Sequence, residues 1–270
     1  MAMSKQETLM ECLTCSHLKT AENWIELEPF VSSEDEISIY RLESTAGCYE
    51  CKVSGLRWVC KKKVTLQYHF RPWDPHRGLL QSMGYRQGGP LLDIKIIAGK
   101  LEEVHLPHFA CFGVEDHYNP TIEQSVRVLS VEDNNVSIGK VDKVTRFHVK
   151  IVHPSFSLRG VILQALGFSV HSDLLIYQDK TAHLTLRTYL IPYDPALKER
   201  IELAHINPPN FYEVFIKDAD FDFRLNLCCK GRKQLKWSQE IREAEYRRPP
   251  PDSPDQQSPA GGSRLGRSPE

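Results

Sequence analysis

The sequence predicts an all-β protein of the β-sandwich class, on three observations. Short segments in which apolar and polar residues alternate recur along most of the chain, and this is the period of strands with one buried face. Clusters of Gly, Pro, Asn and Asp separate these segments at short intervals, as turns do in antiparallel sheets. Helical spacing is confined to one or two short stretches. Many short strands with frequent turns are typical of two packed sheets.

The first half of the chain carries strand patterns from residue 36 onward. Residues 1–35 are polar, acidic and weakly patterned, and we interpret them as an N-terminal extension with at most one short helix. Turn signals at residues 71–75, 88–90 and 133–135 separate the segments that follow. The strands expected in this half span residues 37–40, 64–70, 93–97, 126–131 and 145–152.

The second half continues in the same way, with strands expected at residues 174–177, 183–190 and 221–227. One helix is expected over residues 194–204, because Asp194 is a good N-cap and Pro195 suits the first helical position. A second short helix is expected over residues 237–247. From Arg247 the chain is rich in Pro, Ser and Gly, and we expect a disordered, solvated tail, although its Ser-Pro pairs are also candidate phosphorylation sites.

Composition excludes several classes of protein. The 34 basic and 35 acidic residues nearly cancel, so nothing in the charge favours a nucleic acid or an anionic membrane as a partner. No apolar run approaches the roughly 18 residues of a membrane-spanning helix, and the N-terminus lacks the apolar segment of a secretory signal. The 8 cysteines therefore indicate reduced thiols in a cytoplasmic protein rather than a disulfide framework.

The word Pro154-Ser155-Phe156-Ser157 follows the expected strand at residues 145–152 and points to chemistry. Pro154 cannot donate to a β ladder, so regular pairing should lapse there. A serine hydroxyl then lies beside the Phe156 carbonyl in irregular backbone. If that carbonyl is held distorted, the Ser157 hydroxyl can attack it and the chain can cut itself between Phe156 and Ser157.

Six short motifs, taken in their order along the chain, carry a family resemblance. The motifs are Gly55-Leu56-Arg57-Trp58-Val59-Cys60, Gly89-Pro90-Leu91, His105-Leu106-Pro107-His108-Phe109, Arg146-Phe147-His148-Val149, Pro154-Ser155-Phe156-Ser157 and Tyr189-Leu190-Ile191-Pro192. Together they resemble the function-to-find domain, a paired ZU-five and UPA module of NACHT-leucine-rich-repeat inflammasome sensors, and most closely its fish versions, over roughly residues 30–227.

The resemblance implies two tandem β-sandwich subdomains, a ZU-five-like one over residues 36–156 and a UPA-like one over residues 157–229. It implies autoproteolysis between Phe156 and Ser157, with the two fragments staying associated. Residues 230–270 form a basic segment and the tail, so the UPA-like part should be truncated, and no CARD pattern follows it. The implied partners are the protein's own cleaved fragment, a dipeptidyl peptidase and the UPA domains of full-length sensors.

The nucleophile Ser157 needs a general base, which is worth about 10²–10⁴-fold, and backbone strain of about 1–3 kcal/mol would assist. Ser130 stands where the family has its assisting histidine, and losing that base raises the barrier by about 3–5 kcal/mol. His148 and His153 are the candidate substitute bases. Alternation places His148 on the polar, solvated face of its strand, and His153 lies close to the bond but must fold back to reach it.

Other constellations favour structural roles. Cys12, Cys15, Cys48 and Cys51 form two pairs, but the spacer exceeds the roughly 15–20 residues usual for zinc, and Cys48 and Cys51 should point to opposite faces. His105 and His108, with His117 nearby, are expected to be structural rather than metal ligands. Lysines 61–63 and the cluster at residues 230–236 lack the aromatic residues of a nucleic-acid site.

Two hypotheses follow, and neither requires a cofactor or a metal. The first is a self-processing regulatory module in innate immunity, favoured by the intact Ser155-Phe156-Ser157 word. The second is a non-cleaving interaction or decoy module of the same fold, favoured by Ser130. A hydrolase acting on external substrates is disfavoured, because the chain has no Gly-x-Ser-x-Gly elbow.

Overall fold

The computed structural model describes residues 5–9, 23–34, 37–111, 125–132, 135–155, 157–165, 169–179, 184–192, 194–195, 197–198, 211–216, 221–228 and 235–243. The described residues lie mostly in strands of antiparallel sheets, so the all-β prediction is confirmed. The chain divides into two compact units, Met1–Phe215 and Ile216–Glu270.

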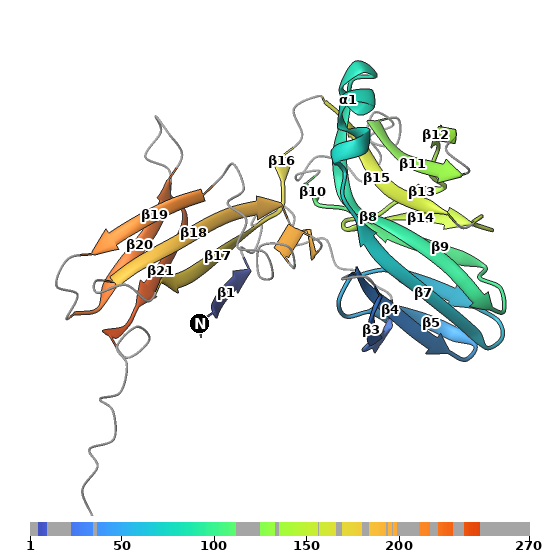
Figure 1. Ribbon diagram of the computed structural model, residues 1–270, viewed down its shortest axis with the longest axis horizontal. Helices are drawn as coiled ribbons and strands as arrows, with labels where there is room; N and C mark the ends of the chain where they lie inside the picture. Colours follow the sequence, from blue (N-terminus) through green and yellow to red (C-terminus); the bar gives the residue numbers. More distant parts are fainter. Residues whose placement is uncertain are drawn as a thin grey trace, which may run out of the picture. The chain divides into compact units, whose positions relative to one another are not determined.

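Two facing sheets build the larger body of the first unit (Figure 1). The seven-stranded sheet has the order β12-β11-β15-β8-β7-β4-β3 and the six-stranded sheet the order β13-β14-β9-β6-β5-β2. The strands of the first sheet are β3 (Phe30–Glu34), β4 (Ile37–Ser44), β7 (Val64–Arg71), β8 (Tyr85–Ala98), β11 (Val126–Glu132), β12 (Asn135–Gly139) and β15 (Leu158–Gln164). Those of the second are β2 (Ile25–Leu27), β5 (Gly47–Cys51), β6 (Arg57–Cys60), β9 (Glu103–Pro107), β13 (Lys143–Val144) and β14 (His148–Val152).

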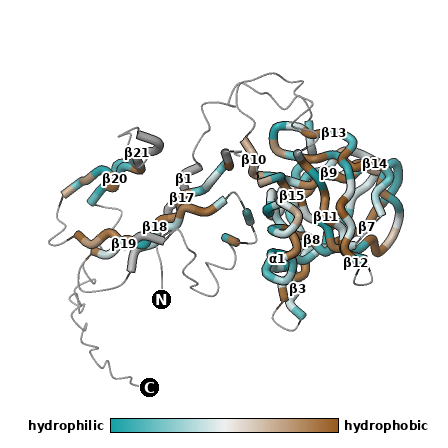
Figure 2. Tube along the Cα trace, turned by 90° about the horizontal axis from the view of Figure 1, so that it is seen from above, coloured by the Kyte–Doolittle hydropathy of each residue, from teal (hydrophilic) through white to brown (hydrophobic). Residues whose placement is uncertain are grey.

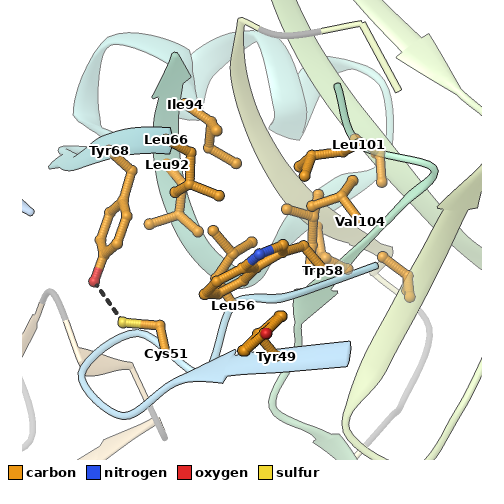
Figure 3. Packing of buried hydrophobic residues seen from close by; sticks show 14 of the residues in the cluster. Tyr49, Cys51, Leu56, Trp58, Leu66, Tyr68, Leu92, Ile94, Leu101 and Val104 are labelled. Atoms are coloured by element: carbon orange, nitrogen blue, oxygen red, sulfur yellow. Dashed lines mark hydrogen bonds between the residues drawn. The ribbon is translucent and has the colours of Figure 1, made fainter. Parts of the chain in front are cut away.

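The core of this body is built from the inward side chains of both sheets, as the period-2 pattern requires. Trp58 and Tyr68 are among its largest fully buried side chains, and Figure 3 shows them with their neighbours. Trp58 donates its indole N–H to Ser44 Oγ at 2.9 Å, and Cys51 Sγ lies 3.1 Å from the Tyr68 hydroxyl. Burial raises the pKa of Tyr68 far above its usual value, so this phenol stays neutral. In Figure 2, apolar and polar residues alternate along the strands of this body.

A helix, α1 (Asp74–Ser82), covers the outer face of the seven-stranded sheet and was not expected from the sequence. Trp73 and Leu80 pack there against Leu91, Leu129 and Ile162. The turn signal at residues 71–75 is therefore the start of a helix, with Pro75 in its first turn. A Cβ on Gly160 would lie 2.5 Å from the Trp73 ring, so only glycine permits this contact.

A third, four-stranded sheet has the order β1-β17-β18-β19, formed by β1 (Lys5–Leu9), β17 (Ser172–Asp179), β18 (Leu184–Pro192) and β19 (Phe211–Ile216). Strands β10 (Ala110–Cys111) and β16 (Ser169–Val170) form a short ladder. In the second unit, β20 (Phe223–Cys228) pairs with β21 (Leu235–Ile241). The strands expected at residues 174–177, 183–190 and 221–227 are thus observed, with shifted ends.

Four further expectations need correction. The turn expected at residues 88–90 is wrong, because β8 continues through these residues from Tyr85 to Ala98. Within the expected N-terminal extension, the described residues contain strands β1, β2 and β3, which pair with later strands. The helix expected over residues 237–247 is wrong, because β21 occupies residues to Ile241 and pairs with β20. The strand expected from residue 145 begins at His148, because Thr145 and His148 close a turn with a backbone hydrogen bond of 2.8 Å.

The helix expected over residues 194–204 is described only at its start. There the Asp194 carboxylate accepts the Leu197 N–H at 3.4 Å, and the Lys198 N–H donates to the Asp194 carbonyl at 3.1 Å. This is the N-cap geometry that the sequence indicates. Most of the remaining residues of the expected helix, and the tail from Arg247, lie outside the described residues.

Candidate functional site

The backbone leaves regular pairing just before the predicted scissile bond. Strand β14 ends at Val152, and β15 begins at Leu158 in the opposite sheet. His153 has φ +49°, and among the described residues it is the non-glycine residue with a positive φ. A left-handed non-glycine residue stores about 1–3 kcal/mol of strain. Pairing therefore lapses around Pro154, as expected from proline. Phe156 lies outside the described residues.

Ser157 stands at the entry of the central strand β15. The next residue, Leu158, pairs with Val131 of β11 on one side and with Asp93 of β8 on the other. The Ser157 carbonyl accepts the Ile94 N–H at 3.4 Å. Its Oγ is buried and has no hydrogen-bond partner among the described residues. A buried hydroxyl without a partner is rare and needs a reason, and an unengaged hydroxyl is free to attack a neighbouring carbonyl.

Ser130 lies on the strand next to Ser157 and on the same side of the sheet. It pairs directly with Arg159, two residues after Ser157 in β15, and is 9% exposed. Diagonal neighbours on paired strands are about 7–8 Å apart, within reach of a ring-bearing side chain but not of a serine. Its short hydroxyl cannot serve as an efficient base for Ser157.

His148 does not lie with Ser157. It is 4% exposed and donates its Nε2–H to the Gly55 carbonyl at 2.8 Å. Burial above all, and then the Arg57 charge, lowers its pKa to about 3. The prediction that His148 is solvated is wrong, because Gly55, far away in the sequence, covers that side of β14. His148 also starts β14, so it stands about 13 Å along the strand from Val152, at the end away from the cleavage word.

His153 is exposed, and its backbone N–H donates to the Glu102 carbonyl at 2.9 Å. The pKa of the Glu102 carboxyl is lowered, mainly by a hydrogen bond from Lys61 and in smaller part by the charge of His153. The imidazole of His153 is thus close enough to Glu102, which precedes β9, to act on it electrostatically. The structure brings neither candidate base into contact with Ser157.

Two charged residues missed by the sequence reasoning do lie at the site. Arg159 donates from Nη2 to Ser155 Oγ at 2.5 Å, and Ser155 donates from Oγ to Glu132 Oε1 at 3.2 Å. The sequence held one signal for Arg159. It stands at the strand period among Ser157, Val161 and Leu163, and an arginine among such core positions is unusual. Glu132 gave no comparable signal, because its contact depends on the register of β11 with β15.

The remaining candidates have structural partners. His105 Nε2 lies 3.1 Å from Glu103 Oε2, and His108 donates its Nε2–H to the Thr145 carbonyl at 2.9 Å. Cys48 is exposed and Cys51 buried, which confirms that they face opposite sides of β5. Cys12, Cys15 and His117 lie outside the described residues. Within the described part of the chain, no group of three or more His, Cys, Asp or Glu residues could hold a metal ion.

No helix of the described residues is long and apolar enough to cross a membrane.

Comparison with known proteins finds a family-model match, "Function to find", over residues 33–169. The chain is 35% identical over 196 residues to a NACHT, LRR and PYD domains-containing protein 1 homolog of Danio rerio, covering 72% of this chain and 14% of that protein. It is 28% identical over 198 residues to the mouse NACHT, LRR and PYD domains-containing protein 1b allele 5, covering 66% of this chain and 16% of the relative. A rat protein, NACHT, LRR and PYD domains-containing protein 1a allele 1, is 28% identical over 177 residues, which are 62% of this chain and 14% of the relative. The chain therefore spans a small part of the length of these curated relatives.

Proposed function

This chain belongs to the function-to-find family, and we propose that it is the autoproteolytic regulatory module of an inflammasome-type innate immune sensor. In this proposal the chain cuts itself between Phe156 and Ser157, and the fragments stay associated. The module acts in the cytoplasm, and its ZU-five-like part spans residues 36–156 and its UPA-like part residues 157–229.

One observation carries the cleavage proposal. The Ser157 hydroxyl is buried without a hydrogen-bond partner in the described part of the chain, at a point where pairing has lapsed and His153 is strained. Among the described residues the desolvated hydroxyl has no competing partner, and strain in the preceding segment can be relieved by breaking the chain. Both features favour attack at the adjacent carbonyl.

The chemistry is an N-to-O acyl shift followed by hydrolysis. Ser157 Oγ bonds to the Phe156 carbonyl carbon and loses its proton, and the amide nitrogen takes up a proton as the C–N bond breaks. Water then opens the ester, which leaves a carboxylate on Phe156 and restores the Ser157 hydroxyl beside a new ammonium. Glu132 follows Val131, the partner of Leu158, so it is the ionisable residue across the ladder from Ser157. A carboxylate is a weak proton acceptor, so we expect cleavage to be slow.

The sheet topology supports the continued association of the fragments. Strand β15 follows the predicted cut but pairs with β8 and β11, which precede it. The ladders β10–β16 and β1–β17 also join a strand before the cut to one after it. Separating the fragments would expose the buried residues Val161, Ile162 and Leu163 together with unpaired backbone groups.

A second candidate function is a non-cleaving interaction or decoy module of the same fold, favoured by Ser130 in place of a general base. Such a module would bind a dipeptidyl peptidase or the UPA domain of a full-length sensor. It uses the same sheets but needs no reaction at Ser157.

An intact mass under denaturing conditions distinguishes the two. The chain is expressed with a tag at each end and compared with Ser157→Ala, which removes one oxygen and leaves the fold unchanged. Two fragments that meet between Phe156 and Ser157, absent from Ser157→Ala, would support self-cleavage. A single uncut species would overturn it and leave the binding module, and partner capture with a dipeptidyl peptidase would follow.

A further inference from the structure

Arg159 occupies a position that an arginine rarely takes. It lies on the core side of β15, in one row with Ser157, Val161 and Leu163, and is 8% exposed. Burying a guanidinium is costly unless it is paired, because the charge loses its hydration. Burial lowers the pKa of Arg159, and the negative charge of Glu132 partly opposes this shift. The two side chains are therefore close enough to interact electrostatically. The contacts of this side chain must therefore offset the cost of its burial.

The contacts of Arg159 bridge the predicted cleavage bond. Its Nη2 donates to Ser155 Oγ at 2.5 Å, so a residue after the bond holds a residue before it. Ser155 Oγ in turn donates to Glu132 Oε1 at 3.2 Å, which ties both to the end of β11. Hydrogen bonds to charged groups are about twice as strong as neutral ones. We call the hydrogen-bonded set Arg159, Ser155 and Glu132 the clamp. It ties the residues on both sides of the bond to the end of β11.

The clamp acts where the chain has left regular strand pairing. Residues 153–155 belong to no strand, and Ser155 is exposed, so main-chain pairing does not fix its position. The side-chain hydrogen bonds are what hold Ser155 in the described structure. A loosely held residue before the bond would let the adjacent carbonyl turn away from Ser157, and small misplacements of reacting groups cost large factors in rate.

We propose that Arg159 is a positioning residue that, through Ser155 and Glu132, holds the segment before the Phe156–Ser157 bond against β11 and so orients it for attack by Ser157. This rests on the proposed self-cleavage, but the holding itself does not require that the bond be cut. Glu132 anchors the clamp in this proposal. That role is the same whether Glu132 or another group accepts the proton of the Ser157 hydroxyl.

The holding is tested by amide hydrogen exchange on the full chain in a Ser157→Ala background, which stays uncut. Arg159→Met keeps the length of the side chain and removes the donor, and Ser155→Ala breaks the clamp at an exposed residue without touching the core. Both should speed exchange in peptides covering residues 153–159 by about tenfold, the loss of one charge-assisted hydrogen bond. Arg127→Met, in the neighbouring strand β11, is the matched control and should leave these peptides unchanged. Unchanged exchange in Ser155→Ala would overturn the proposal.

The orienting role is tested by cleavage rate in the Ser130→His chain, with the serine nucleophile intact. We expect Arg159→Met to slow the appearance of fragments by about tenfold and Arg159→Lys to recover part of the rate, since lysine can still donate to Ser155. An unchanged rate despite faster exchange would show that the clamp is structural only and would overturn the proposal. If no variant is ever cut, the proposed self-cleavage is wrong, and the exchange experiment alone then decides whether the clamp exists.

Discussion

Replacing Ser130 by histidine should accelerate cleavage between Phe156 and Ser157. Ser130 lies in β11, directly opposite Arg159 and one diagonal step from Ser157, with its side chain on the core side. An imidazole at this position spans the gap of about 7–8 Å that serine leaves open. Burial and the Arg159 charge both disfavour the protonated imidazole, so it would be in the neutral form that a base requires.

The size of the effect follows from what a general base contributes. Positioned proton transfer is worth about 10²–10⁴-fold, which corresponds to about 3–5 kcal/mol of the barrier. A chain that takes days to cut itself would then do so within a time between tens of seconds and about an hour. The strained segment around His153 is present in both chains, so its contribution cancels in the comparison.

The assay is a time course of newly made chains, tagged at both ends and resolved under denaturing conditions. Ser130→Ala is the matched control, because it changes the same position without adding a base, and Ser130→His/Ser157→Ala shows that any cut depends on the nucleophile. If Ser130→His forms fragments no faster than Ser130→Ala, position 130 does not address Ser157, and our placement of the base is refuted.

Three further predictions concern the fold. Burial lowers the pKa of His108 to about 4 and of His148 to about 3, from 6.5. Both histidines are neutral in the folded chain, whereas in the unfolded chain they take up protons below about pH 6.5. The free energy of unfolding should therefore fall by about 1.4 kcal/mol per pH unit for each histidine. The fall should continue down to about pH 4 for His108 and about pH 3 for His148. Denaturant titrations from pH 7 to 4 measure this, and His148→Gln should make the decline shallower. Gly89→Ala should lower the melting temperature markedly, because its Cβ would lie 2.2 Å from the Pro107 carbonyl oxygen. In the control Gly78→Ala the Cβ meets nothing within 4 Å, and the helix-forming alanine should raise the free energy of unfolding by up to about 1 kcal/mol. Trp58→Phe should destabilise by about 1–3 kcal/mol, because it removes the indole donor to Ser44, and thermal unfolding measures the difference.

Each of these has a contradicting outcome. If the free energy of unfolding of His148→Gln falls with decreasing pH as steeply as that of the parent chain, this imidazole is not held neutral. Equal melting temperatures for Gly89→Ala and Gly78→Ala would show that the two sheets can separate at Pro107. A Trp58→Phe chain as stable as the parent would mean that the hydrogen bond to Ser44 contributes nothing.

The alternation of apolar residues was enough to predict β4, β7, β11, most of β14 and the end of β8, because each buries one face against the opposite sheet. It did not predict β9 or β15, whose residues are buried on both faces and so do not alternate. It failed at β2 and β3, where Ile25, Phe30 and Val31 are exposed at sheet edges and leave no buried period to detect. Helix α1 escaped for a related reason, since Leu80 is its one buried residue and Pro-rich surroundings resemble a turn. Edge and surface elements take their conformation from the strands that they pair with or pack on, which their own residue pattern does not reveal.

The same distinction applies to the candidate site. Ser157 could be singled out as a candidate nucleophile because the cleavage word places a hydroxyl and a carbonyl in adjacent residues. The burial of His148 could not, because the Gly55 carbonyl that engages it is 93 residues away. The clamp was also out of reach, because Glu132 and Ser155 meet only through the register of β11 and β15.

The central place of β15 also fixes an order of events during synthesis. Its neighbours β8 and β11 leave the ribosome first, and the gap between them stays open until residues 158–164 have been made. Domains fold as their sequence is completed, so the geometry around Ser157 arises only after that last strand has entered the sheet. Any chain that had cut itself would therefore have closed its sheet beforehand, and the proposed cut would be a lasting mark of a successfully folded molecule.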